Sequence, residues 1–132
     1  MIRLHAIHHV AIICSDYVRS KKFYTEALGF SVLSEHYRAD RNSYKLDLAI
    51  DDRYVIELFS FPDPPARVSR PEACGLRHLA FVVEDIEKAV ADLNSKGIKT
   101  EAIRIDEYTD RKFTFFNDPD GLPLELYEYA VH

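Results

Sequence analysis

The chain has 132 residues, of which 47% are hydrophobic and 30% are charged, and its formal net charge is -5. This length suits one compact domain, or two small halves that share one core. The acidic balance, without a basic stretch, argues against nucleic acid and anionic membranes as partners. No apolar run approaches the roughly 20 residues of a membrane span, and the first residues lack the shape of a signal peptide. We therefore expect a cytoplasmic protein whose two cysteines, Cys14 and Cys74, are not bridged.

The predicted elements occur twice along the chain, about seventy residues apart. The stretches "HHVAIIC" and "HLAFVV" are β-branched and apolar, which predicts two buried strands. An amphipathic segment follows each strand and predicts a helix. The first helix is expected to open at Ser15 or Asp16 and to end at Gly29, and the second to open at Glu84 or Asp85 and to end at Gly97. Three further strands are expected in each half, over about 30–37, 44–50 and 54–60, and over about 99–105, 111–117 and 122–128. The fold class is therefore α+β, built from tandem β-α-β-β-β modules.

The repeat also sets the domain organisation. Its halves run over about 7–61 and 76–129, and a linker over about 62–75 contains four prolines, which exclude regular structure there. Each half is too small to bury a curved sheet alone. We therefore expect one domain, residues 1–132, in which the halves pair within the chain or across a dimer.

Histidine and glutamate recur at matched positions in the two halves. Glu57 lies 48 residues after His9, and Glu125 lies 47 residues after His78. If the first and last strands of each half are neighbours, each His–Glu pair converges on one face of its sheet. A carboxylate within an apolar strand is costly unless it is paired or binds a cation. Imidazole and carboxylate ligands suit divalent Zn, Ni, Co, Fe or Mn, so the pattern predicts one metal site with the protein ligands His9, Glu57, His78 and Glu125.

A plainer interpretation applies to any one of these residues. A single strand histidine more often belongs to the core or its rim, and a single edge glutamate more often faces water. The histidines that do not recur in register are interpreted in this way: His5, His8, His36 and His132. Alternation places His8 on the face opposite His9. The matched repetition of both residue types favours the metal site over the plainer interpretation.

Several segments resemble the vicinal oxygen chelate superfamily, also called the glyoxalase/bleomycin resistance/dioxygenase superfamily. They are "HHVAI", "SKKFYTEALGF", "YVIELF", "LRHLAF" and "NDPDGLPLEL", and the similarity covers nearly the whole chain. Within the superfamily the sequence is similar to glyoxalase I and to the small bacterial glyoxalase-related proteins of the YaeR type. The resemblance implies a curved mixed sheet, a homodimer and a small-molecule substrate.

The glyoxalase I ligand set His, Glu, His, Glu falls on His9, Glu57, His78 and Glu125. The resemblance thus implies a divalent-metal-dependent lyase or isomerase acting on a 2-oxoaldehyde thiol hemithioacetal or a similar vicinal-oxygen substrate. Glu125 or Glu57 would be the catalytic base, with Glu125 favoured by analogy. The short chain resembles the Ni- or Co-activated class more than the Zn-activated class, while Mn and Fe stay open. The alternatives are a metal-dependent binding or resistance protein without turnover, and an Fe(II) dioxygenase.

Two positions depart from the glyoxalase I enzymes that use glutathione. Those enzymes tend to hold the γ-glutamyl end with an Arg four residues after the first His and an Asn four residues after the first Glu, where this chain has Ile13 and Phe61. Glutathione adducts are therefore expected to be poor substrates. Candidates for another anion anchor are Arg38, Arg41, Lys45, Arg77, Arg104 and Arg111. Candidates for an apolar substrate pocket, equally suited to a plain core, are Phe59, Phe61, Tyr108, Phe113 and Phe115.

Overall fold

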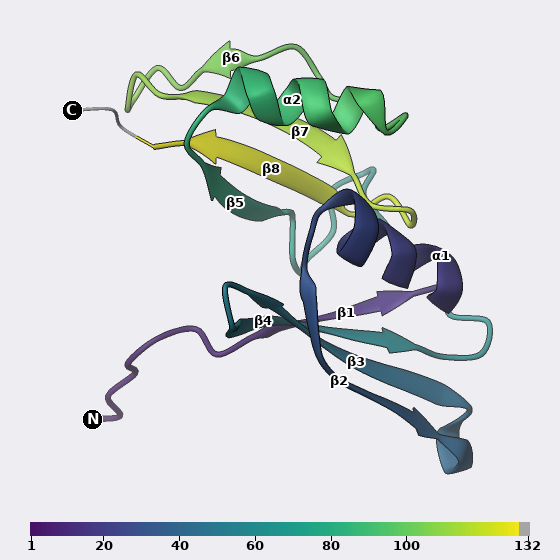
Figure 1. Cartoon of the computed structure of the whole chain (residues 1–132). Helices are drawn as coiled ribbons and strands as arrows, with labels where there is room; N and C mark the ends of the chain where they lie inside the picture. The colour runs from purple at the N-terminus through teal and green to yellow at the C-terminus, as the bar shows by residue number, and fades with distance from the viewer. Residues whose placement is uncertain (130–132) are drawn as a thin grey trace. The chain divides into compact units, whose positions relative to one another are not determined.

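The computed structural model describes residues 1–129, so His132 lies outside the described residues. The chain forms two compact units that divide between Ala66 and Arg67, inside the predicted linker. Residues 61–78 contain no helix or strand, as the prolines predict (Figure 1). None of the helices in the described part of the chain is long and apolar enough to span a membrane. Cys14 is buried, Cys74 is exposed, and both are free thiols.

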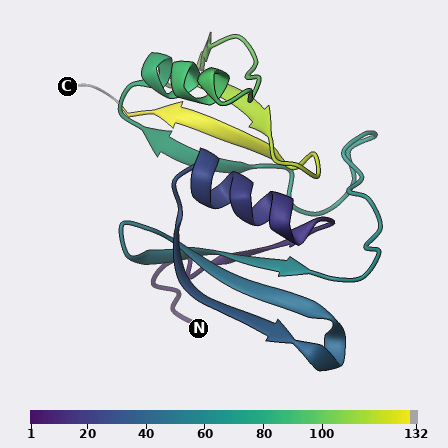
Figure 2. The ribbon, with the colours of Figure 1, turned by 45° about the vertical axis from the view of Figure 1, so that its right-hand side comes forward.

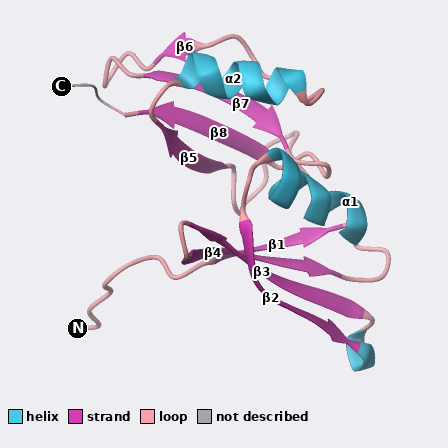
Figure 3. Cartoon of the chain, viewed as in Figure 1, coloured by secondary structure: helices cyan, strands magenta, loops and turns pink. Residues whose placement is uncertain are grey.

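The first unit is a four-stranded sheet with one longer helical segment and a short 3-10 helix over Ala39–Arg41 (Figure 3). Its strands are β1 (Val10–Cys14), β2 (Ser31–Arg38), β3 (Ser43–Ile50) and β4 (Arg53–Ser60), in the spatial order β1-β4-β3-β2. β1 runs parallel to β4, and the other neighbours are antiparallel. The turn between β3 and β4 places Asp51 and Asp52 at φ values of 46° and 65°, a left-handed conformation that Asp tolerates better than most residues.

The helical segment of the first unit begins at α1 (Tyr17–Lys22) and continues as a π-helix over Phe23–Ala27. The Asp16 side chain accepts a hydrogen bond from the Arg19 N–H at 3.1 Å, which satisfies a free amide at the helix start. Gly29 ends the segment at a φ of 81°, where a side chain would be strained. The helix start and stop were predicted, but the wider π turn was not.

The second unit repeats the connectivity of the first (Figure 2). Its elements are β5 (Leu79–Val83), α2 (Ile86–Ser95), β6 (Arg104–Ile105), β7 (Lys112–Asn117) and β8 (Pro123–Glu128). The spatial order is β5-β8-β7-β6, with β5 parallel to β8. Asp85 caps α2 through the Lys88 N–H, and Gly97 follows the helix at a φ of 78°. The predicted tandem β-α-β-β-β fold is therefore confirmed.

One predicted strand is much shorter than expected. The range 99–105 was predicted as a strand, whereas β6 covers only Arg104 and Ile105. Upstream of β6 the chain contacts β7 by an irregular pattern: the Glu101 N–H donates to the Phe115 carbonyl, and the Thr114 hydroxyl donates to the Glu101 carbonyl. A side-chain donor replaces a backbone donor at this point, so a regular ladder does not form.

Each sheet has two unlike faces. One face packs against the helix of its own unit, α1 against β4 and α2 against β8. The residues on these faces are aliphatic and almost fully buried, including Leu46, Leu48, Ile56 and Leu58 in the first unit and Ile86 and Leu124 in the second. Strand alternation places Glu57 and Glu125 on the opposite face of each sheet, and the predicted histidine, just before β1 or β5, lies beside its glutamate.

We expect Leu58→Ala to lower the free energy of unfolding by about 2–5 kcal/mol. Leu58 is 0% exposed on β4, so the shorter side chain leaves a cavity that the sheet and α1 cannot fill. Urea unfolding monitored by circular dichroism measures the change. Val18→Ala, at a position 75% exposed on α1, is the matched control and should change stability by less than about 0.5 kcal/mol. Equal effects of the two substitutions would contradict the packing described here.

Candidate metal centre

In the first unit, His9 and Glu57 lie side by side. The parallel pairing of β1 with β4 sets Ala11 opposite Glu57, and His9 comes just before β1. The His9 Nε2 atom is 3.6 Å from the Glu57 Oε1 atom. The Glu57 side chain is only 15% exposed, so its carboxylate is partly removed from water. The structure thus brings together the first predicted ligand pair.

The second unit repeats this arrangement with His78 and Glu125. Ala80 is paired with Glu125 across β5 and β8, just as Ala11 is paired with Glu57. The His78 Nε2 atom lies 3.4 Å from the Glu125 Oε1 atom, and the Glu125 side chain is 14% exposed. Each unit therefore supplies two of the four predicted ligands in nearly the same local geometry.

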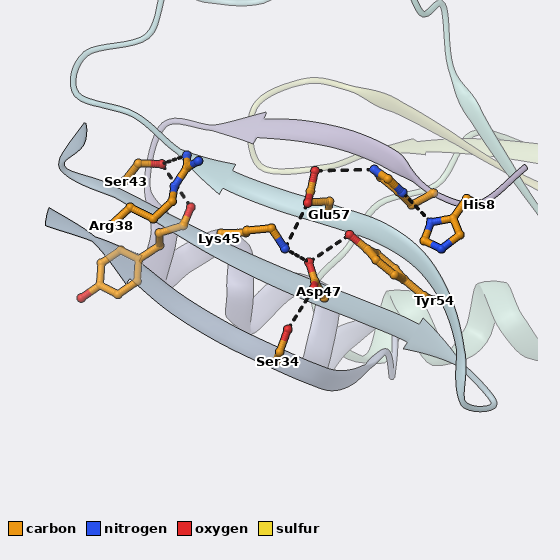
Figure 4. Close-up of polar contacts among 10 residues, drawn as sticks. His8, Ser34, Arg38, Ser43, Lys45, Asp47, Tyr54 and Glu57 are labelled. Atoms are coloured by element: carbon orange, nitrogen blue, oxygen red, sulfur yellow. Dashed lines mark hydrogen bonds and ion pairs between the residues drawn. The ribbon is translucent and has the colours of Figure 1, made fainter. Parts of the chain in front are cut away.

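A polar network surrounds Glu57 in the first unit (Figure 4). The Lys45 ammonium lies 3.1 Å from the Glu57 Oε2 atom and 2.7 Å from the Asp47 Oδ1 atom. Ser34 and Tyr54 also donate hydrogen bonds to Asp47, at 2.8 Å and 2.9 Å. Glu57 therefore already has a cation beside it before any metal ion is considered, and a bound ion would share this carboxylate with Lys45.

The network holds its members in definite charge states. The hydrogen bond to Asp47 raises the pKa of Lys45. Burial alone would raise the pKa of Asp47, but the hydrogen bonds from Lys45, Ser34 and Tyr54 outweigh burial and lower it. Burial, followed by the bond to Asp47, raises the pKa of Tyr54 well above its ordinary value. At neutral pH the network is thus a lysine cation, an aspartate anion and a neutral phenol.

Within residues 67–129, the glutamate of the second unit has other neighbours than Glu57 has in the first. Lys45 is paired with Phe59 across β3 and β4, and Asp47 is paired with Glu57. At the matching positions of the second unit, Phe113 is paired with Tyr127 and Phe115 with Glu125. Two phenylalanines, Phe113 and Phe115, thus replace the lysine and the aspartate, and the Phe115 ring meets the His78 ring edge-on at 5.1 Å.

These apolar surroundings change the chemistry of the second glutamate. Burial raises the pKa of Glu125, and this effect outweighs the opposing field of His78. The repeat makes Glu57 and Glu125 equivalent in position, but their neighbours make them unequal: Glu57 is ion-paired with Lys45, whereas Glu125 lies among aromatic rings.

Two side chains beside His9 were not predicted to lie there. The Tyr54 ring stacks on the His9 ring at 5.0 Å. Strand alternation would place Tyr54 opposite Glu57, but a bulge between β3 and β4 shifts it to the same face. His8, expected on the opposite face, instead has its Nδ1 atom 2.8 Å from the His9 Nδ1 atom. The expectation for His8 was wrong because His8 precedes β1, where alternation does not apply.

The arginines that were candidates for an anion anchor differ in their neighbours. The Arg38 guanidinium lies 4.8 Å from the centre of the Phe59 ring and 5.8 Å from that of Phe61, on the face that carries Glu57. Ion pairs join three other arginines to nearby acids: Arg41 with Asp40, Arg77 with Glu72, and Arg104 with Glu101. Of the candidate pocket aromatics, Tyr108 is almost fully exposed, whereas Phe115 lines the cavity described next.

A cavity of about 520 Å³ opens in the second unit beside His78. Its lining comes from the loop over residues 67–77 and from β7 and its neighbours, and includes Arg67, Arg70, Arg77, Arg104, His78 and Phe115. Arg77 and Arg104 were among the candidate anion anchors. Arg67 and Arg70 were missed, because the proline-rich segment was interpreted only as a linker. The signal was present in the sequence as three arginines within eleven residues.

A cluster of three acidic residues lies at the start of α2, with carboxylate oxygens within 4.8 Å of one another. Asp85 caps the helix, Glu87 is ion-paired with Lys112 at 2.7 Å, and Glu128 accepts the Ile86 N–H. The protein itself therefore supplies partners for all three carboxylates, and the cluster is explained as a helix cap.

Duplicated modules with a His–Glu pair on one face of each sheet define a class of protein. Residues 6–126 match the Glyoxalase/Bleomycin resistance protein/Dioxygenase superfamily, and the chain belongs to this superfamily. It is 64% identical to the uncharacterized protein YaeR of Escherichia coli over 97% of this chain and 99% of that protein. It is 65% identical to the uncharacterized protein YwkD of Bacillus subtilis over 95% of this chain and 98% of that protein.

Solved structures and a more distant enzyme extend the comparison. The structure of a glyoxalase family protein from Enterococcus faecalis superimposes with a TM-score of 0.87 at 55% identity, covering 93% of this chain and 97% of that one. Glyoxalase I of Saccharomyces cerevisiae is 29% identical over 94% of this chain but only 45% of the yeast protein. The high-identity relatives therefore support the family, and glyoxalase I of yeast is a more distant relative.

Proposed function

We propose that this chain is a divalent-metal-dependent lyase or isomerase of the glyoxalase I type. Its substrate would be the hemithioacetal of a 2-oxoaldehyde and a thiol, or a similar molecule with two vicinal oxygens. The observation that carries the proposal is the matched geometry of two His–Glu pairs, with nitrogen–oxygen distances of 3.6 Å and 3.4 Å in the two units. The distant similarity to yeast glyoxalase I gives this chemistry further support.

The donor set fits a divalent ion. We propose that His9, Glu57, His78 and Glu125 together hold one ion, as two imidazole nitrogens and two carboxylate oxygens. Partly buried carboxylates of this kind need a cation or a donor, and the exposed fractions of 15% and 14% are low for glutamate. Such a set suits Ni, Co, Zn, Mn or Fe, and leaves positions open on a six-coordinate ion.

The two glutamates would have different tasks. When bound, the ion supplies a Lewis acid for the two neighbouring substrate oxygens. Glu125 takes the carbon-bound proton of the substrate and returns it to the adjacent carbon, because its carboxylate lies beside the His78 imidazole, whereas that of Glu57 is ion-paired with Lys45. Glu57 stays with Lys45 and holds its end of the site in place.

The assembly completes the proposal. Each unit provides only half of the ligand set, so the site requires both units, from one chain or from two. We propose a cytoplasmic homodimer, in keeping with the family resemblance and with the small core that each unit buries.

The choice of metal gives the first test of the proposed activity. Ni(II) and Co(II) hold six-coordinate sites readily, whereas Zn(II) tends toward four ligands, so we expect faster turnover with Ni(II) or Co(II) than with Zn(II). Metal-free protein would be reconstituted with each ion, and the isomerisation of methylglyoxal hemithioacetals followed by absorbance. A best rate with Zn(II) would contradict the metal assignment. Tight binding of the hemithioacetals without any product would instead indicate a binding protein.

A further inference from the structure

The cavity beside His78 concentrates positive charge in an acidic protein. Its lining includes four arginines, Arg67, Arg70, Arg77 and Arg104, and two glutamates, Glu72 and Glu101. The whole chain, by contrast, has a net charge of -5. Its volume of about 520 Å³ lies within the usual range for small-ligand pockets, about 300–1,000 Å³. The local excess of arginine therefore needs an explanation beyond ordinary surface charge.

Two of the four arginines are occupied by the protein. The Arg67 guanidinium donates to the carbonyls of Leu76 and Arg77, at 2.6 Å and 3.0 Å, and so ties the two ends of the 67–77 loop together. Arg104 is ion-paired with Glu101 at 2.9 Å and lies over an aromatic ring of β7. These two side chains shape the cavity and have little capacity left for a ligand.

The other two arginines are available. The Arg70 side chain makes no hydrogen bond or ion pair with any residue between 1 and 129. Arg77 is 75% exposed, and its only ion pair within the same range is a loose one to Glu72, at 3.5 Å. Arg70 and the loosely paired, exposed Arg77 both line this cavity, and guanidinium groups are suited to bidentate binding of a planar or tetrahedral anion.

We propose that Arg70 and Arg77 bind an anionic group of the substrate, a carboxylate or a phosphate, while the reacting end lies at His78. The inference rests on the proposed function for the reacting end, because His78 lines the same cavity. It also accounts for Ile13 and Phe61, which remove the usual anchors of the first half.

Anion binding to the metal-free full-length chain tests the proposal, because no metal ion is then present to attract the anion. Inorganic phosphate and acetate would be titrated separately at constant ionic strength, and the arginine Nε–H signals followed by NMR. We expect saturable shifts of the Arg70 and Arg77 signals. The double variant Arg70→Gln with Arg77→Gln should bind the preferred anion about tenfold more weakly, as the loss of charged hydrogen bonds predicts.

Matched variants make the result decisive. Arg41→Gln, which removes an exposed arginine of the first unit, should leave the affinities for phosphate and for acetate unchanged. Arg70→Gln alone removes no interaction within the described chain, so it should fold normally and still weaken binding. Tighter binding of acetate would indicate that the substrate group bound by Arg70 and Arg77 is a carboxylate. Tighter binding of phosphate would indicate a phosphate ester. Equal binding by the wild type and the double variant would overturn the proposal. Metal content is measured separately in variants of the four proposed metal ligands. That measurement tests the proposed function and not the proposed anion site.

Discussion

His78→Ala is expected to weaken metal binding by about 100-fold. Binding of a structural divalent ion contributes about 10–16 kcal/mol, so one of four ligands accounts for about 3 kcal/mol. The His78 imidazole lies 3.4 Å from the Glu125 carboxylate, and its ring neighbour is Phe115, which offers no ligand atom. Metal content after dialysis against a defined free-ion concentration would be measured by inductively coupled plasma mass spectrometry.

Alanine substitution of each of the other three ligands is also expected to weaken metal binding, and comparing the four variants tests whether they share one ion. His9→Ala should have an effect similar to that of His78→Ala, although His8 lies close enough to recover part of it. His5→Ala, in the exposed N-terminal segment, is the control and should retain full metal content. Full occupancy in either His9→Ala or His78→Ala would show that the two pairs do not share one ion.

Glu125→Gln is expected to reduce kcat by about 10²–10⁴-fold, the usual contribution of a positioned acid–base group. The amide keeps an oxygen that can face the ion but cannot accept the substrate proton, so metal content should fall far less than turnover. Steady-state hemithioacetal isomerisation, with metal content measured on the same samples, separates the two effects.

Glu57→Gln is the comparison that distinguishes the two glutamates. Because Glu57 is ion-paired with Lys45, we expect its loss to act mainly on metal retention and less on kcat. Glu107→Gln, on the exposed loop before β7, is the neutral control. A larger loss of kcat in Glu57→Gln than in Glu125→Gln would assign the base to the first unit instead.

The residues around Glu57 also explain why the spacing of the repeat alone did not distinguish the two glutamates. Lys45 and Asp47 occupy the positions that Phe113 and Phe115 occupy in the second unit. The substitutions are visible in the sequence only after the strands are aligned in register, because pairing across β3 and β4 depends on the exact offset of the two strands. The sequence therefore predicted two equivalent pairs, and the structure shows one polar and one aromatic environment.

What the sequence determined by itself rests on local patterns. Strand alternation, helix periodicity and the stops at Gly29 and Gly97 specify two β-α-β-β-β modules without any long-range information. Matched spacing then places His9 with Glu57 and His78 with Glu125, because parallel pairing of the first and last strands follows from the connectivity of each module. These features depend on short chain segments, and the structure reproduces them.

What only the tertiary structure decided depends on register and loop packing. A bulge turns Tyr54 onto the His9 ring, and strand pairing brings Lys45 to Glu57. Hydrogen bonds from Arg67 to backbone carbonyls close the 67–77 loop, so that Arg70 reaches the cavity beside His78. A bulge shifts the pairing of two strands by one residue and so changes the face on which the following side chains lie. A loop closes through contacts between residues that are distant in sequence. Neither leaves a periodic signal in the sequence, and both become visible only when the folded chain brings its segments together.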